Sequence, residues 1–325
     1  MREVELKMKE RAAALLQSGE VARVIGWKKG DFCYDPSPAV FENVEELDLF
    51  VYDYFCGANL SKYLIDVSKK EGKTAVFLKP CDSYSFNQLV KEHRIKRENI
   101  YVIAVECLAK LDIEKIKAKG ISLIESVEVV DKEVKVTSAY GEETLAKPEV
   151  ILTKCETCQK THQAKDEEII LHERPARDVN RFAEVEKLEN MTADERFAFW
   201  REQLSKCIRC NACRNVCPAC SCVKCVFDNP ASGIAAKAND SDFEENMFHL
   251  IRAFHVAGRC TDCGECSRVC PQNIPLHLLN RKFIKDIDTL YGEYQAGETA
   301  EGKTPLTSYT EGDIEPKDVL NGEAK

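Results

Sequence analysis

Two cysteine-rich stretches share one spacing: CIRCNACRNVCP at residues 207–218 and CTDCGECSRVCP at residues 260–271. Both follow the pattern C-x-x-C-x-x-C-x-x-x-C-P. A turn of backbone with three thiolates, each two residues from the next, can wrap three corners of an iron–sulfur cube. The fourth cysteine lies too far round to complete the same cube. The repeated spacing therefore predicts two 4Fe-4S clusters in the C-terminal half of the chain.

The two runs resemble those of bacterial-type ferredoxins, and this resemblance implies crossed ligand sets. One cluster is then held by Cys207, Cys210, Cys213 and Cys270. The other is held by Cys260, Cys263, Cys266 and Cys217. Five basic residues beside these cysteines are either counter-charges for the clusters or ordinary solvated side chains: Lys206, Arg209, Arg214, Arg259 and Arg268.

Zinc is the alternative occupant of paired cysteines, and it would make the chain a structural adaptor. Zinc ribbons, however, close one tetrahedron with two C-x-x-C pairs and have no use for a third and fourth thiolate in each run. The spacing favours iron–sulfur clusters over zinc.

The totals of the sequence exclude several other classes of protein. The chain has 325 residues, 17 cysteines and a net charge of -9. A negative chain is a poor ligand for nucleic-acid phosphates. No apolar stretch is long enough to span a membrane, and residues 1–20 predict an amphipathic helix where an export signal would have an apolar segment. We therefore expect a cytoplasmic protein whose cysteines bind metal and do not form a disulfide framework.

Residues 1–165 predict an α/β domain with a mostly parallel sheet. Short apolar runs at 21–27, 47–53, 73–79 and 99–105 are typical of strands, and helical patterns near 58–70 and 83–93 lie between them. Alternating apolar and charged residues at 124–144 predict a hairpin at the edge of this sheet.

The rest of the chain divides into three predicted segments. Charge dominates residues 166–192, which we interpret either as a connector or as a solvated helix. For residues 193–291 we expect an α-helical dicluster ferredoxin domain. A helix near 193–205 is predicted at its start. Residues 292–325 are rich in Gly, Glu, Thr and Pro and predict an extended tail.

Four further cysteines predict a third 4Fe-4S cluster in the N-terminal domain. Cys81 and Cys107 each follow a predicted strand, and the carboxyl ends of parallel strands meet at one edge of a sheet. Cys155 and Cys158 follow the strand-like run PEVILTK and can reach the same edge. The alternative is that Cys81 and Cys107 are small buried residues at strand ends.

Three segments around these cysteines resemble a known family. They are LKPCDSYSF around Cys81, VEC at Cys107, and KCETC with the later Asp166. They are similar to the beta subunits of deazaflavin-reducing hydrogenases and formate dehydrogenases, and to those of sulfhydrogenases and anaerobic sulfite reductases. The resemblance implies a cluster beside FAD and redox subunits as partners. FAD rests on this resemblance alone, because the sequence has no G-x-G-x-x-G and no P-loop.

Five cysteines fall outside these sets: Cys33, Cys56, Cys220, Cys222 and Cys225. The last three either form an additional metal site or surround the second cluster with sulfur. The six histidines show no paired metal spacing, and we identify no catalytic residue.

The sequence as a whole favours an iron–sulfur electron-transfer subunit of a multi-subunit anaerobic oxidoreductase. Its partners are expected to belong to a hydrogenase, formate dehydrogenase, heterodisulfide-reductase-like or electron-bifurcating complex. The alternative is an FAD-containing subunit that reduces a deazaflavin or a nicotinamide.

Overall fold

The computed structural model describes residues 1–159, 161–170, 178–229, 231 and 241–307. The chain forms two compact units. The first comprises Met1–Ser83 and His93–Val179, and the second comprises Tyr84–Glu92 and Asn180–Lys325. Helix α3 (Pro80–Lys91) begins in the first unit and continues in the second.

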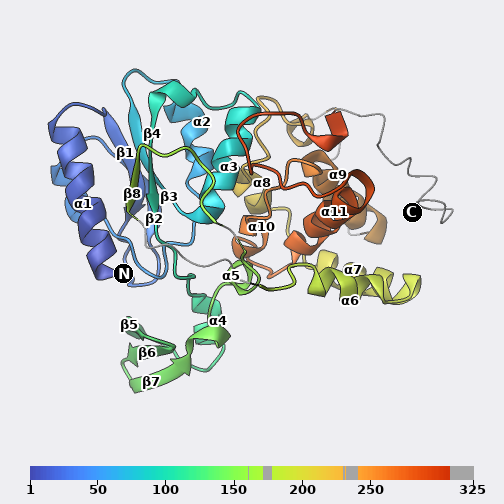
Figure 1. The fold of residues 1–325 in the computed structure, drawn as a ribbon. Coiled ribbons are helices and arrows are strands. Elements are labelled where there is room, and N and C mark those ends of the chain that lie inside the picture. The colour runs from blue at the N-terminus through green and yellow to red at the C-terminus, as the bar shows by residue number, and fades with distance from the viewer. Residues whose placement is uncertain (160, 171–177, 230, 232–240, 308–325) are drawn as a thin grey trace. The chain divides into compact units, whose positions relative to one another are not determined.

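The first unit is built on a five-stranded sheet with the order β2-β1-β3-β4-β8 (Figure 1). Its strands are β1 (Arg23–Lys28), β2 (Ser37–Phe41), β3 (Thr74–Leu78), β4 (Ile100–Val105) and β8 (Glu168–Ile170). The pairs β1–β3, β3–β4 and β4–β8 are parallel, and β2 pairs with β1 antiparallel. The mixed α/β content expected for this part of the chain is therefore confirmed.

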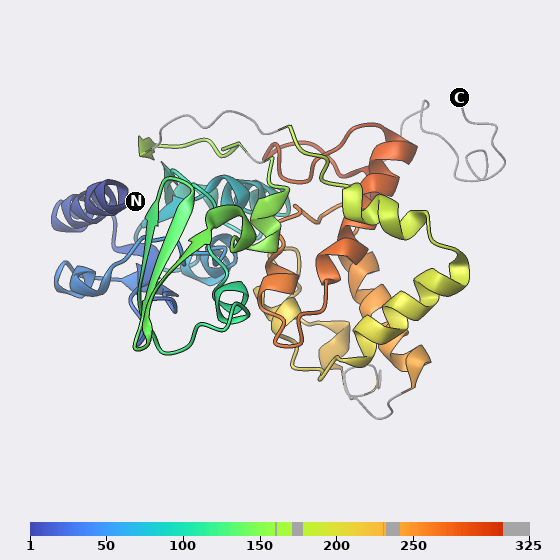
Figure 2. The same cartoon turned by 90° about the horizontal axis from the view of Figure 1, so that it is seen from below.

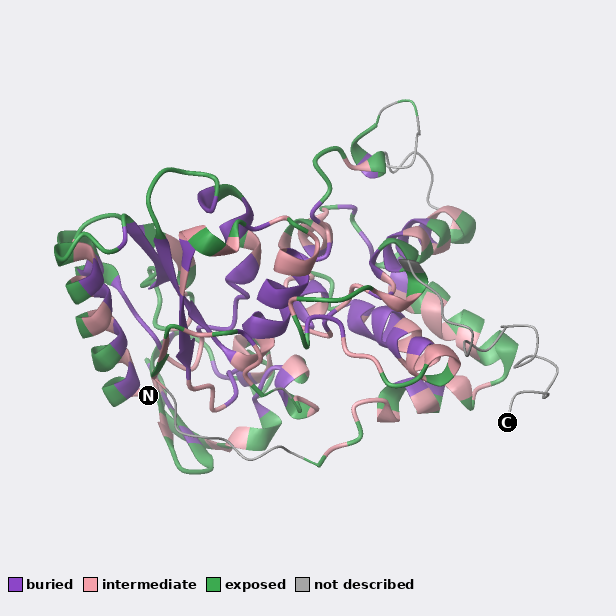
Figure 3. Ribbon diagram, turned by 45° about the horizontal axis from the view of Figure 1, so that its top comes forward, coloured by how far each residue is buried: buried purple, intermediate pink, exposed green. Residues whose placement is uncertain are grey.

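Helix α1 (Arg2–Gln17) packs against β1, β3 and β8. Its buried residues, Val4, Met8, Ala12 and Leu15, recur at helical spacing, and Figure 3 shows the helix buried along one side only. All residues of β3 are buried, as expected for a central strand covered on both faces. Gly26 in β1 leaves room for Phe50, because a Cβ atom there would lie 2.5 Å from the Phe50 Cε2 atom.

The prediction of a strand at 47–53 is wrong. Residues Glu45–Leu49 form a 3-10 helix, η1, and only Phe50 makes an isolated bridge, to Lys28. Three acidic residues stand in the first turn of η1, and the side chain of Asn43 accepts a hydrogen bond from the Glu46 amide at 3.0 Å. This local capping competes with extended backbone in an apolar run of only a few residues.

Strands β2 and β8 were not expected. β8 lies in the charged segment predicted as a connector, and an apolar pattern cannot reveal a strand of three residues. Its Glu168 accepts two hydrogen bonds of 2.7 Å from the Arg11 Nε atom, which ties β8 to α1. The helix expected near 58–70 is shorter than predicted, with a 3-10 turn η2 (Ser61–Tyr63) followed by α2 (Leu64–Val67).

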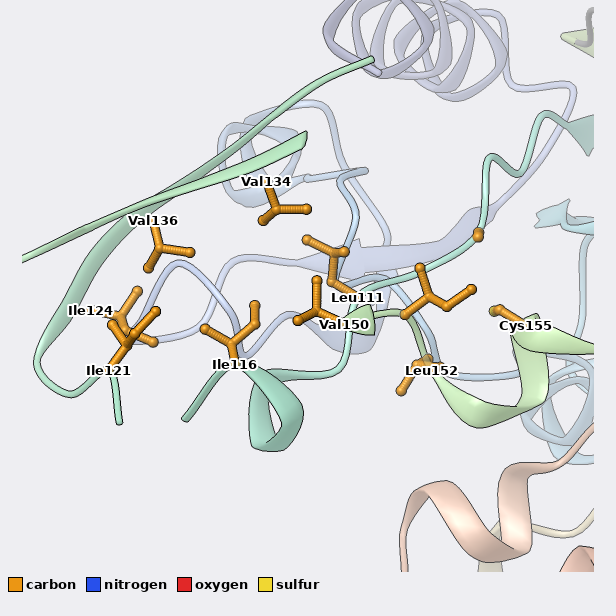
Figure 4. Packing of buried hydrophobic residues seen from close by; sticks show 11 residues of the cluster. Leu111, Ile116, Ile121, Ile124, Val134, Val136, Val150, Leu152 and Cys155 are labelled. Atoms are coloured by element: carbon orange, nitrogen blue, oxygen red, sulfur yellow. The ribbon is translucent and has the colours of Figure 1, made fainter. Parts of the chain in front are cut away.

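Residues 124–146 form a separate three-stranded antiparallel sheet of β5 (Ile124–Val130), β6 (Glu133–Ser138) and β7 (Gly141–Ala146). The β5–β6 hairpin confirms the prediction of a turn, and Asp131 in it has a φ of 53°. Its predicted place at the edge of the five-stranded sheet is wrong. The small sheet has its own core, in which Val134 and Val136 pack with Ile116 of α4 (Ile113–Lys117) and Val150 (Figure 4).

The second unit is helical in the part of the chain that the structure describes (Figure 2). Besides the end of α3, its helices are α6 (Ala183–Glu189), α7 (Ala193–Ser205), α8 (Ala212–Val216), α9 (Asp242–Val256), α10 (Glu265–Arg268) and α11 (Leu276–Tyr291). The expected helix near 193–205 is thus confirmed, and it begins with a capping box between Thr192 and Glu195. Helix α9 packs against α7 and α11, and α10 packs against α8 and α11.

The predicted tail is only partly described. Residues Pro305–Thr307 form a 3-10 turn, and residues 308–325 lie outside the described residues. Residues 171–177 of the predicted connector also lie outside them. None of the described helices is both long enough and apolar enough to cross a membrane.

Candidate metal centres

The two cysteine runs have the same local backbone. In the first run Arg209 and Asn211 have φ values of 55° and 61°, and in the second Asp262 and Gly264 have φ values of 55° and 68°. These positions are equivalent in the two runs, because in each run one residue directly precedes the second cysteine and the other directly follows it. Left-handed backbone is accessible to Asn, Asp and Gly, which explains three of the four residues found there. The sequence repeat is therefore a structural repeat.

Each run then enters a short helix that carries its third cysteine. Cys213 lies in α8 and Cys266 lies in α10. The Arg209 amide donates a hydrogen bond to the Cys207 Sγ atom at 3.4 Å, and the Asp262 amide donates in the same way to Cys260. Hydrogen bonds from the backbone to sulfur favour thiolate over thiol.

The four cysteines of the first predicted set come together. Cys207, Cys210, Cys213 and Cys270 all line one hollow. His249 of α9 lines the same hollow. Burial raises the pKa of Cys207 and of Cys213, so that these thiols become thiolates most easily when a cation or metal cluster compensates the charge.

The four cysteines of the second predicted set also lie close enough to interact. Burial raises the pKa of Cys266 to about 12, and the charge of Cys217 adds to the effect. Burial likewise raises the pKa of Cys260 and of Cys263, and Cys217 again contributes to both shifts. Cys217 itself differs, because a hydrogen bond from the Cys220 thiol lowers its pKa to about 6. Cys217 is therefore the member of this set most ready to act as a thiolate.

A buried cation shows that this region suits an anionic group. The Arg252 guanidinium is 1% exposed, and within the described residues none of its three nitrogens has a hydrogen-bond partner. A buried charge without a partner costs several kcal/mol, typically about 3–5 kcal/mol when one member of an ion pair is removed. Iron–sulfur clusters bound to thiolates are anionic, whereas free thiols are neutral. The buried Arg252 guanidinium therefore suits a site in which these cysteines bind clusters better than a site of free thiols.

The four cysteines of the third predicted set are neighbours in the first unit. Cys81 lies at the start of α3 after β3, and Cys107 follows β4. The charge of Cys107 acts on both Cys81 and Cys155, and the charge of Cys158 acts on Cys155. The strand expected before Cys155 is reduced to one isolated bridge, between Ile151 and Leu111. Lys147–Glu149 form a 3-10 turn, and Thr153–Glu156 form the short helix α5.

Three lysines that the sequence analysis did not identify lie near cysteines of the third set, Lys79 and Lys154 near Cys81 and Lys110 near Cys107. The Nζ atoms of Lys79, Lys110 and Lys154 donate to the backbone oxygens of Ala58, Asp53 and Gly57 at 2.8, 2.6 and 2.7 Å. Lys79 and Lys110 are almost fully buried, and Lys79 also pairs with Asp82 at 2.8 Å. The only available signal was the position of Lys79 and Lys110 at or near the ends of apolar runs.

The remaining cysteines have different surroundings from one another. Cys33 and Cys222 are exposed, and Cys56 is buried with its Sγ atom 3.4 Å from the Asp53 Oδ1 atom. Cys220 hydrogen-bonds to Cys217, whereas Cys225 lies beside the Arg214 guanidinium. Of the three cysteines that follow Cys217, namely Cys220, Cys222 and Cys225, Cys220 is the one that contacts the second set.

One group of mixed ligands also occurs within the described residues. Donor atoms of Cys207, Glu245 and His249 lie within 4.8 Å of one another, and all three residues are buried. Because Cys207 and His249 also line the hollow of the first set, this group is part of that site.

Residues 203–274 match the family described as the 4Fe-4S dicluster domain. Over a longer span, the F420-dependent formate dehydrogenase subunit beta of Methanocaldococcus jannaschii is 25% identical, covering 85% of this chain and 88% of that protein. The F420-dependent formate dehydrogenase 1 subunit beta of Methanococcus maripaludis is 26% identical, with 84% of this chain and 87% of that protein covered.

A solved chain from the F420-reducing NiFe hydrogenase complex of Methanosarcina barkeri has a TM-score of 0.37 and 12% identity, covering 49% of this chain and 62% of that chain. This likeness is too slight to establish a shared fold.

The dicluster domain and its cysteines define this chain as an iron–sulfur protein of the 4Fe-4S class. Over most of its length the chain is similar to formate dehydrogenase beta subunits, as the sequence resemblance predicted.

Proposed function

We propose that this chain is an iron–sulfur electron-transfer subunit of an oxidoreductase complex and relays single electrons between partner subunits. The repeated fold of the two cysteine runs carries the proposal. In each run, residues at the same two positions have left-handed backbone, and a short helix that carries a buried cysteine follows them. Two relatives named as formate dehydrogenase beta subunits support a place in a complex of that kind.

Eight of the eleven cysteines of the second unit are proposed to act in the crossed sets. Cys207, Cys210, Cys213 and Cys270 hold one cluster, and Cys260, Cys263, Cys266 and Cys217 hold the other. A 4Fe-4S cluster bound to four thiolates gains and loses one electron without making or breaking bonds to substrate. The chain's own residues supply the thiolates, bury the site and keep its charge partly compensated.

A third 4Fe-4S cluster is proposed in the first unit, held by Cys81, Cys107, Cys155 and Cys158. The mutual interactions of these thiols support it. The nearby ammonium groups of Lys110 and Lys154 support it as well, because positive charge stabilises a group of thiolates.

The names of the two relatives, which are F420-dependent, favour a second candidate function, the exchange of reducing equivalents with a deazaflavin. The resemblance of the sequence to that family implies FAD as the group that would carry out this exchange. The binding of FAD stays a prediction. Acid denaturation of the fully loaded complex would release flavin with its characteristic absorbance if this candidate is correct. Absence of flavin from that sample would contradict it.

Replacement of one ligand tests the relay. In the complete complex, Cys213→Ser should abolish or reduce electron transfer by at least about a hundredfold, because serine is a poor ligand for this corner of the first cluster. Cys33→Ser is the matched control, since Cys33 is exposed and lies outside all the proposed sets. Turnover that is unchanged in Cys213→Ser, measured with the natural donor and acceptor of the complex, would contradict the proposal.

A further inference from the structure

Helix α9 lies between the two cysteine runs in the sequence and contributes a buried arginine to the dicluster site. Arg252 is 1% exposed, and its neighbour Ala253 is fully buried in the core that also contains Cys207, Cys213 and Cys266. Within the described part of the chain, the Nε, Nη1 and Nη2 atoms of Arg252 have no hydrogen-bond partner. The side chain therefore places an uncompensated positive charge inside the unit.

The basic residues beside the cysteines in the sequence differ from Arg252, because each has a carboxylate partner. Arg209 pairs with Glu245 at 3.5 Å, Arg214 with Asp228 at 2.7 Å, Arg259 with Glu92 at 2.5 Å, Arg268 with Glu265 at 2.8 Å, and Lys206 with Glu202 at 3.6 Å. A paired cation contributes little net charge to its surroundings. Arg252 is thus a stronger candidate for charge compensation than these five.

The stretch of α9 that carries Arg252 packs against cysteines of both predicted sets. Ala253, the next residue, shares a buried core with Cys213 of the first set and Cys266 of the second. Val256, one helical turn further along, packs with Cys217 of the second set. The positive charge of Arg252 favours the thiolate form of the same three cysteines.

We propose that Arg252 is a counter-cation shared by the two clusters, and that it raises their reduction potentials together. The proposal rests on the function proposed above, in which these cysteines bind clusters. Reduction adds one negative charge at each site, and a fixed positive charge in a region of low dielectric stabilises that added charge. Because one residue acts on both sites, its removal shifts both potentials in the same direction.

The test is a redox titration of the full chain followed by electron paramagnetic resonance. Dithionite supplies one electron to each oxidised cluster, and no bond forms or breaks. In Arg252→Gln we expect both signals to move to lower potential. At a fixed potential, the ratio of reduced to oxidised cluster should fall by at least about tenfold, which is 59 mV for a one-electron couple. Arg252→Lys keeps the charge, and its ratios should stay within about threefold of wild type.

Arg214→Gln is the matched control, because Arg214 directly follows a predicted ligand but is paired with Asp228. It should leave both potentials close to those of wild type. Unchanged potentials in Arg252→Gln would overturn the proposal, and a shift of only one signal would show that the arginine is not shared. Wild-type protein without any iron–sulfur signal would instead contradict the proposed function itself.

Loss of iron in Arg252→Gln is also informative, with Arg252→Lys as the deciding variant. Retention of both clusters in the lysine variant would support the requirement for charge. If the lysine variant also fails to bind iron, the site needs the shape of the guanidinium and not its charge, and the proposal is wrong.

Discussion

At the residue scale, the sequence reveals the candidate cysteine ligands but not the buried arginine beside them. The resemblance of the two runs to those of ferredoxins predicts the four cysteines that line the first hollow, three from the first run and Cys270 from the second. Arg252 could not be found in this way. It lies eight residues before Cys260, outside both runs, and only the packing of α9 brings it to the thiols. Nearness in sequence favoured five basic residues that the structure pairs with carboxylates.

The third set of cysteines gives a prediction at the same scale. Replacement of Cys81 by serine should lower the iron content from about twelve to about eight atoms per chain, because a 4Fe-4S cluster would lose one of its four ligands. Iron and acid-labile sulfide analysis of anaerobically purified protein measures this change.

The control for this prediction is Cys33→Ser, since Cys33 is exposed and belongs to none of the proposed sets. It should keep the wild-type iron content. A wild-type value near eight that is unaltered by Cys81→Ser would show that Cys81, Cys107, Cys155 and Cys158 hold no cluster.

At the scale of elements, the long buried strands were predictable and the short ones were not. β3 and β4 are continuous apolar runs covered on both faces, so composition alone identifies them. β8 has three residues and depends on a contact with α1, far away in the sequence, that no local pattern encodes. The same limit explains the segment at 47–53, where the capping interactions of η1 prevail over a short apolar run.

The contact between α1 and β8 makes stability depend on pH. The hydrogen bonds from Arg11 lower the pKa of Glu168 below 4.5, so the carboxylate is more stable in the folded chain than in the unfolded one. Its contribution is therefore fully present above about pH 4.5 and is lost as the pH falls through the lowered pKa.

Arg11→Gln should lower the free energy of unfolding by about 1 kcal/mol at pH 7, because the pair is only partly buried. The difference between variant and wild type should shrink as the pH approaches 3. Urea unfolding at the two pH values measures it. An equal difference at both values would contradict this account of the pair.

At the scale of the whole molecule, the chain has two compact units, each with its own group of cysteines. An α/β part and a helical dicluster part were predictable, because alternating apolar runs and the repeated C-x-x-C spacing stand in different halves of the sequence. The small sheet of β5, β6 and β7 was predicted as an edge hairpin. It has a core of its own, and alternation of apolar and charged residues cannot say which sheet a hairpin joins.

The central claim is that the two cysteine runs bind a pair of 4Fe-4S clusters that carry single electrons. Its most direct test is quantitative electron paramagnetic resonance of the anaerobically purified full chain after reduction with dithionite. The account predicts reduced 4Fe-4S signals that integrate to about one spin for each of the two clusters of the second unit, with any third cluster adding to them. A colourless sample that contains zinc and gives no signal after reduction would contradict it.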